Sequence, residues 1–302
     1  MGSSLLTNSS AMTALQTLRN VSSQLATTQS RISTGQRVAT ASDNAAYWSI
    51  ATSMRADNAA LSAVSDSLGL SAATVDTEYT ALTSVVGDST GGLVKLQSLL
   101  VEAKTAGIDR TKIQADITQI QQQMKGTASA ATFNGVNWLS ATTATPATVN
   151  LVSSFSRVGG TPTTGTIALT TSNYSLYTST STGILDTVSG GASINTLTIA
   201  TLTDSVADQT TLDGYIAKVT AAINSVASAA ANLGAVKNRV STNTDFVKTL
   251  MDSVDRGVGQ LVDADMNAES TRLQALQTQQ QLGVQALSIA NQNSQSILSL
   301  FK

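Results

Sequence analysis

The stretch LDGYIAKVTAAINSVASAAANLGAVKNRVSTNTDFVKTLMDSVDRGV, residues 212–258, repeats apolar side chains at steps that alternate between four and three residues. An average step of about 3.5 residues is typical of the buried seam of a coiled coil. The stretch therefore predicts one long helix that buries this seam against other helices. The seam consists of Leu212, Ile216, Val219, Ile223, Val226, Ala230, Leu233, Lys237, Val240, Thr244, Val247, Met251, Val254 and Val258.

Two shorter stripes with similar spacing lie upstream. Gly91 and Gly92 stand between them and predict a turn. The two prolines of the chain, Pro146 and Pro162, leave both flanks free of the residue that most disrupts helix interiors. We therefore expect all three stripes to pack as one elongated helical bundle. The shorter stripes are Leu61, Val64, Leu68, Ala72, Val75, Tyr79, Leu82 and Val86, and then Ile113, Ile117, Ile120 and Met124.

Both ends of the chain carry thinner stripes. The N-terminal one is Ala11, Leu15, Leu18, Ser22, Leu25, Gln29 and Ile32, and the C-terminal one begins at Leu273. A helix with so narrow an apolar face is marginal alone in water. We predict that both ends are loosely ordered in the monomer and become ordered by packing against other copies. The predicted polymer-interface residues are Leu15, Leu18, Leu25, Ile32, Leu273, Leu276, Leu287, Ile297, Leu298 and Leu300.

The middle of the chain, residues 143–206, has a different composition. It is rich in Thr, Ser and Gly, and its only charges are Arg157, Asp186 and Asp204. Apolar residues alternate with polar ones over 166–170, 173–178 and 195–202, which predicts short strands. The expected fold class is thus mainly α: an elongated helical bundle with terminal coiled-coil helices and a small β-rich insert.

Composition excludes several classes of function. Charged residues make up 12% of the chain, and the net charge of −2 provides no basic patch for nucleic acid. The absence of Cys and His removes thiolate nucleophiles, histidine triads and the usual zinc sites. No apolar run approaches the ~20 residues that cross a bilayer, and no cleaved signal peptide is apparent. We expect no catalytic residue, metal, cofactor or membrane insertion.

Short polar motifs have plain structural interpretations. Asp43 and Asn44 are predicted to cap a helix, because their side-chain oxygens accept backbone N–H bonds there; the alternative is a calcium or substrate site. Asn134-Gly135 is predicted to form a tight turn rather than a reactive loop.

Two other local patterns have similar interpretations. The pair Asp263 and Asp265 suits a helix start better than acid–base chemistry or cation binding. Tyr47-Trp48 is expected to fill a local core.

Five segments of the sequence resemble bacterial flagellins. RISTGQRVATASDNAA, residues 31–46, followed by Ile50-Ala51, resembles the N-terminal signature of that family. FNGV, residues 133–136, is similar to the segment that ends the N-terminal half of its helical domain. DADMNAE, QALSIANQ and QSILSLF, starting at residues 263, 285 and 295, resemble its C-terminal helix. The resemblance covers about 1–140 and 207–302, and Tyr47-Trp48 departs from it.

This resemblance implies an extracellular filament subunit for swimming motility. Inner coiled-coil segments would be 1–42 and 261–302, helical rod segments 43–142 and 207–260, and the variable outer domain 143–206. It also implies type III export in an unfolded state and polymerisation with itself or with sister flagellins. The further implied partners are an export chaperone, a filament cap and hook-junction proteins.

Three alternative functions remain at this point. One is a hook–filament junction protein of the same flagellum, whose ends resemble those of flagellin. Another is an enzyme carried in the insert, which has no His or Cys and only two acidic residues. The last is a generic secreted coiled-coil adhesin, whose ends would be dispensable.

Overall fold

The computed structural model describes residues 8–141, 148–158, 160–188 and 191–299. The chain divides into two compact units. Unit 1 comprises residues 1–59 and 252–302, and unit 2 comprises residues 60–251. The helices α2 (Ala45–Val86) and α5 (Val206–Val262) contribute residues to both units. The fold is mainly helical with a small β insert, which confirms the predicted fold class.

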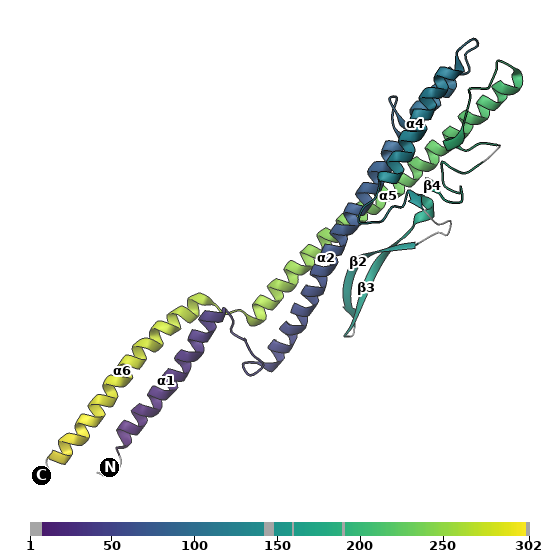
Figure 1. Cartoon of the computed structure of the whole chain (residues 1–302). Coiled ribbons are helices and arrows are strands. Elements are labelled where there is room, and N and C mark those ends of the chain that lie inside the picture. The colour runs from purple at the N-terminus through teal and green to yellow at the C-terminus, as the bar shows by residue number, and fades with distance from the viewer. Residues whose placement is uncertain (1–7, 142–147, 159, 189–190, 300–302) are drawn as a thin grey trace. The chain divides into compact units, whose positions relative to one another are not determined.

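Unit 1 is built on two antiparallel helices, α1 (Ser9–Thr34) and α6 (Met266–Ser299), which run side by side in Figure 1. The Asn8 side chain caps α1 and also donates to the carbonyl of Ala290, which links the start of α1 to the far part of α6. At the other end α1 stops at Gly35, whose left-handed φ of 70° turns the chain. The Gly35 carbonyl then accepts the amide of Ala264, just before α6.

The α1–α6 seam has a different phase from the predicted stripe on α1. Leu18, Leu25 and Ile32 are at least half-buried, as the stripe requires. Ser22 and Gln29 are exposed, and Val21 and Thr28 are buried in their place. The difference arises because a straight helix repeats every 3.6 residues, so one sequence supports two neighbouring stripes. The seam residues on α1 are Ala11, Ala14, Leu18, Val21, Leu25, Thr28 and Ile32, and those on α6 are Leu273, Leu276, Gly283, Leu287 and Ala290.

A short link and a small core hold α2 and α5 together inside unit 1. The amides of Arg37 and Val38 both donate to the carbonyl of Val262, at 2.7 and 3.2 Å. Val38 then packs with Ala51 of α2 and Val258 of α5 in an apolar cluster. The loop after α1 is therefore fixed by backbone bonds on one side and by apolar burial on the other.

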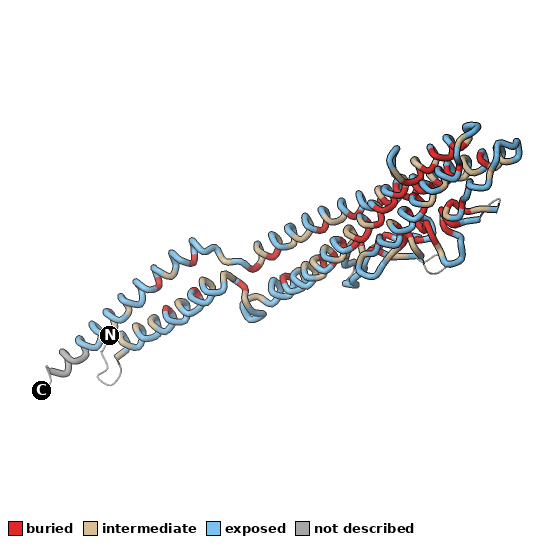
Figure 2. The backbone as a smooth tube through the Cα atoms, turned by 45° about the horizontal axis from the view of Figure 1, so that its top comes forward, coloured by how far each residue is buried: buried red, intermediate tan, exposed pale blue. Residues whose placement is uncertain are grey.

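Unit 2 is a helical bundle formed by α2, α3 (Gly92–Glu102), α4 (Arg110–Ala130) and α5. Its buried positions follow the predicted stripes, as the red segments of Figure 2 show along these helices. The predicted stripe on α4 is buried at all four positions, which confirms it. On α5 the strongest positions recur every seven residues, and each is at most 1% exposed. They are Leu212, Val219, Val226, Leu233, Val240 and Val247.

The expectation that no apolar run approaches the length needed to cross a bilayer is wrong for α5. Within the described residues, α5 is long and apolar enough by length and composition to cross a membrane, with a mean hydropathy of 1.3 over one window. Residues 219–236 carry no charge, but they include Asn, Ser and Thr and are rich in Ala. Such a run also suits a bundle helix, because small residues allow close packing around the buried Val226 and Leu233.

The turn between α2 and α3 depends on two glycines. Gly87 and Gly92 have φ values of 68° and 67°. A Cβ on Gly92 would lie 2.6 Å from the carbonyl oxygen of Val85, which is too close for any side chain. The sequence prediction of a turn at Gly91-Gly92 is confirmed, with the Asp88 side chain accepting the amide of Thr90.

The strands of the insert differ from those predicted, and one of its two long strands, β2, lies outside all three predicted ranges. The range 166–170 lies in β3 (Thr161–Thr170), which pairs antiparallel with β2 (Thr148–Val158). The range 173–178 contributes only β4 (Tyr177–Thr178), parallel to β1 (Ser140–Ala141), and follows the 3₁₀ turn η1 (Thr171–Asn173).

The third predicted strand, 195–202, is absent from the structure. The chain forms the 3₁₀ turn η2 (Ile194–Thr196) and then continues irregularly. The reason is visible in the hydrogen bonds to α4. Gln121 donates to the carbonyls of Ile194 and Leu197, and Gln114 accepts the amide of Ile199 at 2.6 Å. Side chains of a helix thus satisfy backbone groups that would otherwise need a partner strand.

Candidate assembly surface

Exposed apolar side chains concentrate in unit 1. Among the described residues, nine of the fifteen large apolar side chains that are exposed belong to this unit, which holds about a third of the chain. Such patches mark surfaces that pack against other molecules. The nine are Met12, Leu15, Tyr47, Trp48, Ile50, Met266, Leu282, Val284 and Ile289.

The predicted interface residues divide into two groups in the structure. Leu15 is exposed on α1, whereas the other predicted residues of α1 and the predicted residues of α6 up to Leu287 lie on the α1–α6 seam. Leu276 is 4% exposed and is the best-covered of them. The side chains of Ile297 and Leu298, and the whole of Leu300, lie outside the described residues.

Five apolar residues are exposed on the outside of the helix pair, and of these the sequence analysis had predicted only Leu15. Leu282 and Ile289 are each 59% exposed and stand seven residues apart on one face of α6, and Val284 is exposed on another face of the same helix. Met12 and Leu15 are the exposed large apolar residues of α1. A signal was present, because the spacing of seven between Leu282 and Ile289 marks a second stripe beside the seam. We call these five residues the outer apolar set.

Few charges accompany the outer apolar set. The helix α1 carries only Arg19 and Arg31, and α6 carries only Glu269 and Arg272. Arg31 pairs with the buried Glu269 at 3.2 Å and so joins the two helices. Like-charge repulsion between copies of this helix pair is therefore weak, which suits packing against other copies of the same chain.

Asn44 caps the start of α2, whereas Asp43 forms hydrogen bonds within the loop before this helix. The Asn44 side chain accepts the amide of Tyr47 in the first turn of α2. Asp43 instead accepts the amides of Ala39 and Thr40, and these bonds lower the pKa of its carboxyl group. Tyr47 and Trp48 do not fill a local core as expected, since they are 40% and 37% exposed on the surface of unit 1.

The other polar motifs are local structure. The Asp265 carboxylate accepts the amides of Asn267 and Ala268 in the first turn of α6, and Asp263 is exposed and pairs through its backbone with Gln36. Asn134 and Gly135 have φ values of 50° and 78° in a turn that Phe133 and Val136 close with two backbone bonds. Those bonds are both 2.9 Å long.

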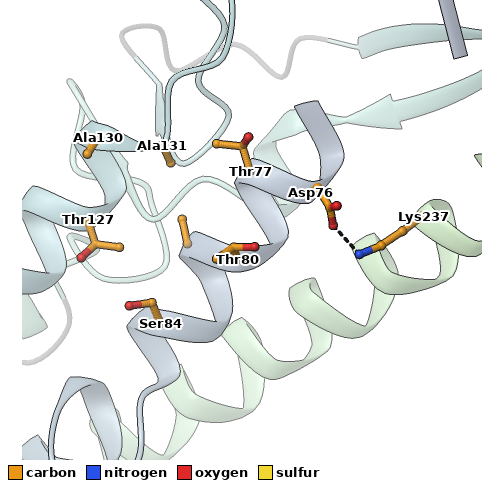
Figure 3. Close-up of a pocket in the computed structure, with 9 residues that line it drawn as sticks. Asp76, Thr77, Thr80, Ser84, Thr127, Ala130, Ala131 and Lys237 are labelled. Carbon is orange, nitrogen blue, oxygen red and sulfur yellow. Dashed lines mark hydrogen bonds and ion pairs between the residues drawn. The ribbon is translucent and has the colours of Figure 1, made fainter. Parts of the chain in front are cut away.

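Unit 2 contains an open groove of about 770 Å³ between α2 and α4, drawn in Figure 3. Its walls carry short side chains such as Thr80, Ser84 and Thr127, and the ion pair between Asp76 and Lys237 crosses one side. The described residues contain no group of three His, Cys, Asp or Glu that could hold a metal ion. Asp76 and Lys237 are the charged residues that line this groove.

Comparison with known proteins identifies the family. The bacterial flagellin N-terminal helical region matches residues 5–144, and the bacterial flagellin C-terminal helical region matches residues 216–301. Flagellin C of Rhizobium meliloti (strain 1021) is 43% identical over 326 residues, covering 99% of each chain. The flagellin of Brucella melitensis is 44% identical over 300 residues, again covering 99% of each chain. The chain therefore belongs to the bacterial flagellin family, whose members are structural subunits of the flagellar filament.

Proposed function

We propose that this chain polymerises into the extracellular filament of a bacterial flagellum for swimming, and that it has no catalytic activity. The observation that carries this proposal is the outer apolar set on a charge-poor pair of helices. Covering apolar surface stabilises by ~25 cal/mol per Å² removed from water, so repeated copies gain from standing side by side.

Contacts on both faces of the helix pair contribute to this assembly. Leu18, Leu25, Leu276 and Leu287 set the shape of each pair through the seam. Leu282, Ile289 and Leu15 then contact neighbouring copies, with Ile297, Leu298 and Leu300 extending the same interface. A surface that contacts a different surface of the next copy generates an open helical polymer rather than a closed ring.

The remaining partners follow from this route. An unfolded chain passing through a type III export channel is compatible with the absence of Cys, since no disulfide has to be broken. An export chaperone on the C-terminal end, a filament cap and hook-junction proteins are the further partners, and sister flagellins can join the polymer. Neither nucleic acid nor membrane insertion is part of this proposal.

The test compares aspartate substitutions on the two faces of α6. Leu282→Asp leaves the monomer helical but stops elongation from filament seeds, because it buries an unpaired charge between copies. Leu287→Asp also stops elongation and in addition lowers monomer helicity, because it breaks the seam. Thr198 is exposed in the insert, and the control protein with Thr198→Asp is expected to elongate normally.

Elongation is measured by light scattering and electron microscopy, and monomer helicity by far-ultraviolet circular dichroism. Normal elongation of the Leu282→Asp protein would contradict the proposed interface. Native filaments sheared from cells address the junction alternative, because a junction protein would be present there in only a few copies.

A further inference from the structure

A buried carboxyl group lies in unit 2 at the point where the insert joins the helices. Glu78 of α2 is 0% exposed, and its Oε1 accepts the backbone amide of Trp138 at 2.7 Å. Its other oxygen, Oε2, is buried and has no hydrogen-bond partner. The indole Nε1 of Trp138 is likewise buried without a partner. A carboxyl group in such a place is stable when protonated and costly when ionised.

The contact made by Glu78 continues into the insert. Asn137 fixes the approach, because its side-chain oxygen accepts the amides of Leu139 and Ser140. The carbonyl of Leu139 then accepts the amides of Leu176 and Tyr177, at 2.8 and 3.0 Å, where β1 pairs with β4. Releasing Trp138 from α2 therefore loosens the strand pair that follows it.

We propose that Glu78 is a proton-operated latch: its protonated side chain holds the segment at Trp138 against α2, and loss of the proton loosens that segment together with β4. This latch lies outside the surface assigned to filament assembly and goes beyond that function.

The electrostatics support the direction of the latch. Burial raises the pKa of Glu78 to about 7, and the Trp138 amide opposes the shift only in part. No charged neighbour contributes to this shift. The titratable groups on the surrounding elements include Asp76 and Tyr79 on α2, Lys125 on α4, Lys237 on α5, and Tyr174, Tyr177 and Asp186 in the insert.

Two of the carboxyl groups on these elements are already engaged. Asp76 pairs with Lys237, and Asp186 accepts the amide of Thr178 at 2.6 Å. Solvent reaches the neighbourhood, because the groove of Figure 3 is lined by Thr77 and Ala81, within one helical turn of Glu78.

The sign of the effect follows from linkage. The latched carboxyl group holds its proton up to about pH 7, whereas the released one titrates near its ordinary value of 4.5. Latching is therefore complete below pH 4.5, weakens as the pH rises from 4.5 to 7, and is weakest above 7. Between pH 4.5 and 7 the equilibrium constant for release of the Trp138 segment from α2 rises about tenfold for each pH unit.

Hydrogen exchange of the full-length monomer tests the latch. After correction for intrinsic exchange, the protection of the Leu176 and Tyr177 amides falls about tenfold per pH unit between pH 5 and 7 and then levels off. In Glu78→Gln the same amides show no pH dependence. In Asp76→Asn, a neighbouring exposed carboxyl group of the same helix, the slope is unchanged. Flat protection in the unaltered protein, or a full slope in Glu78→Gln, overturns the proposal.

A second measurement does not depend on the folding of Glu78→Gln. The chain has two tryptophans, and Trp48→Phe removes the exposed one, so that fluorescence reports only on the buried Trp138. Quenching of this protein by acrylamide rises between pH 5 and 7 and then stays constant. Quenching that does not change with pH contradicts the latch.

Discussion

Arg110 shows how a single residue joins the helices of unit 2 to the end of the insert. Its guanidinium is 7% exposed and donates to the carbonyls of Ala103 and Leu202 and, at 2.6 Å, to the carboxylate of Asp204. Asp204 also accepts the amide of Gly107. The α3–α4 turn and the segment that leads into α5 are therefore held by one cation, whose buried position makes its partners costly to leave unpaired.

Removal of this cation is expected to destabilise unit 2. Arg110→Met keeps the apolar stem but leaves two carbonyls and a carboxylate without their donor, at a cost of ~3 kcal/mol. Urea unfolding followed by circular dichroism measures this change. Arg239→Met, at an exposed site on α5, is the matched control and shifts stability by less than ~0.5 kcal/mol.

The same contact predicts an acid sensitivity. Hydrogen bonding to Arg110 and to the Gly107 amide holds the pKa of Asp204 below its ordinary value of 3.8. Its contribution to stability is therefore present above pH 3.8 and is lost as the pH falls through the lowered pKa. The difference in urea midpoint between the unaltered protein and Asp204→Asn should shrink between pH 6 and pH 3. A difference that stays constant over this range would show that Asp204 does not titrate as described.

At the scale of elements, the turn between α2 and α3 is the most constrained connection of unit 2. Gly92 has a left-handed φ and lies against the carbonyl of Val85. Because the helices α2 and α3 meet through this contact, any side chain there forces them apart.

Two glycine substitutions compare this constrained turn with an open position inside a helix. Gly92→Ala is expected to destabilise the protein by more than ~1 kcal/mol, because both the backbone angle and the close approach resist a Cβ. Gly126→Ala, in the interior of α4 with nothing within 4 Å of its Cβ position, is expected to stabilise by ~0.5–1 kcal/mol. Thermal unfolding of both variants measures the contrast, and destabilisation by Gly126→Ala would be inconsistent with the open space beside it.

At the scale of the whole molecule, the two units have separate cores. Unit 1 has a small apolar cluster around Val38, Ala51 and Val258 together with the α1–α6 seam. Unit 2 has the long buried stripes of α2, α4 and α5. Removing one terminal helix therefore leaves the core of unit 2 intact.

Deletion of residues 1–30 or of residues 275–302 is thus expected to give a soluble helical protein that cannot form filaments. Each deletion removes half of the α1–α6 seam and part of the outer apolar set. Size-exclusion chromatography and circular dichroism establish that the truncated protein is folded, and seeded elongation followed by electron microscopy shows whether it assembles. Filaments formed by either truncated protein would refute the role assigned to the ends.

Much of the fold could be predicted from the sequence, because spacing alone determines where a helix buries its apolar side chains. The seven-residue recurrence from Leu212 to Val247 predicted α5, and the stripe from Ile113 to Met124 predicted α4. The alternation of apolar and polar residues predicted the strands of the insert less reliably. The apolar residues Leu197 and Ile199 are buried as predicted for a strand, yet Gln114 and Gln121 of α4 replace the partner strand.

The sequence by itself determined the long helices, the strand at 166–170 and the family signatures, since these depend on periodicity and local residue order. Only the tertiary structure decided which of two adjacent stripes on α1 and α6 faces inward, and hence that Leu282 and Ile289 remain outside. It alone revealed that Glu78 is buried against Trp138, 60 residues away in the chain. The physical reason is that burial depends on what the partner element covers, and a sequence pattern does not specify that partner.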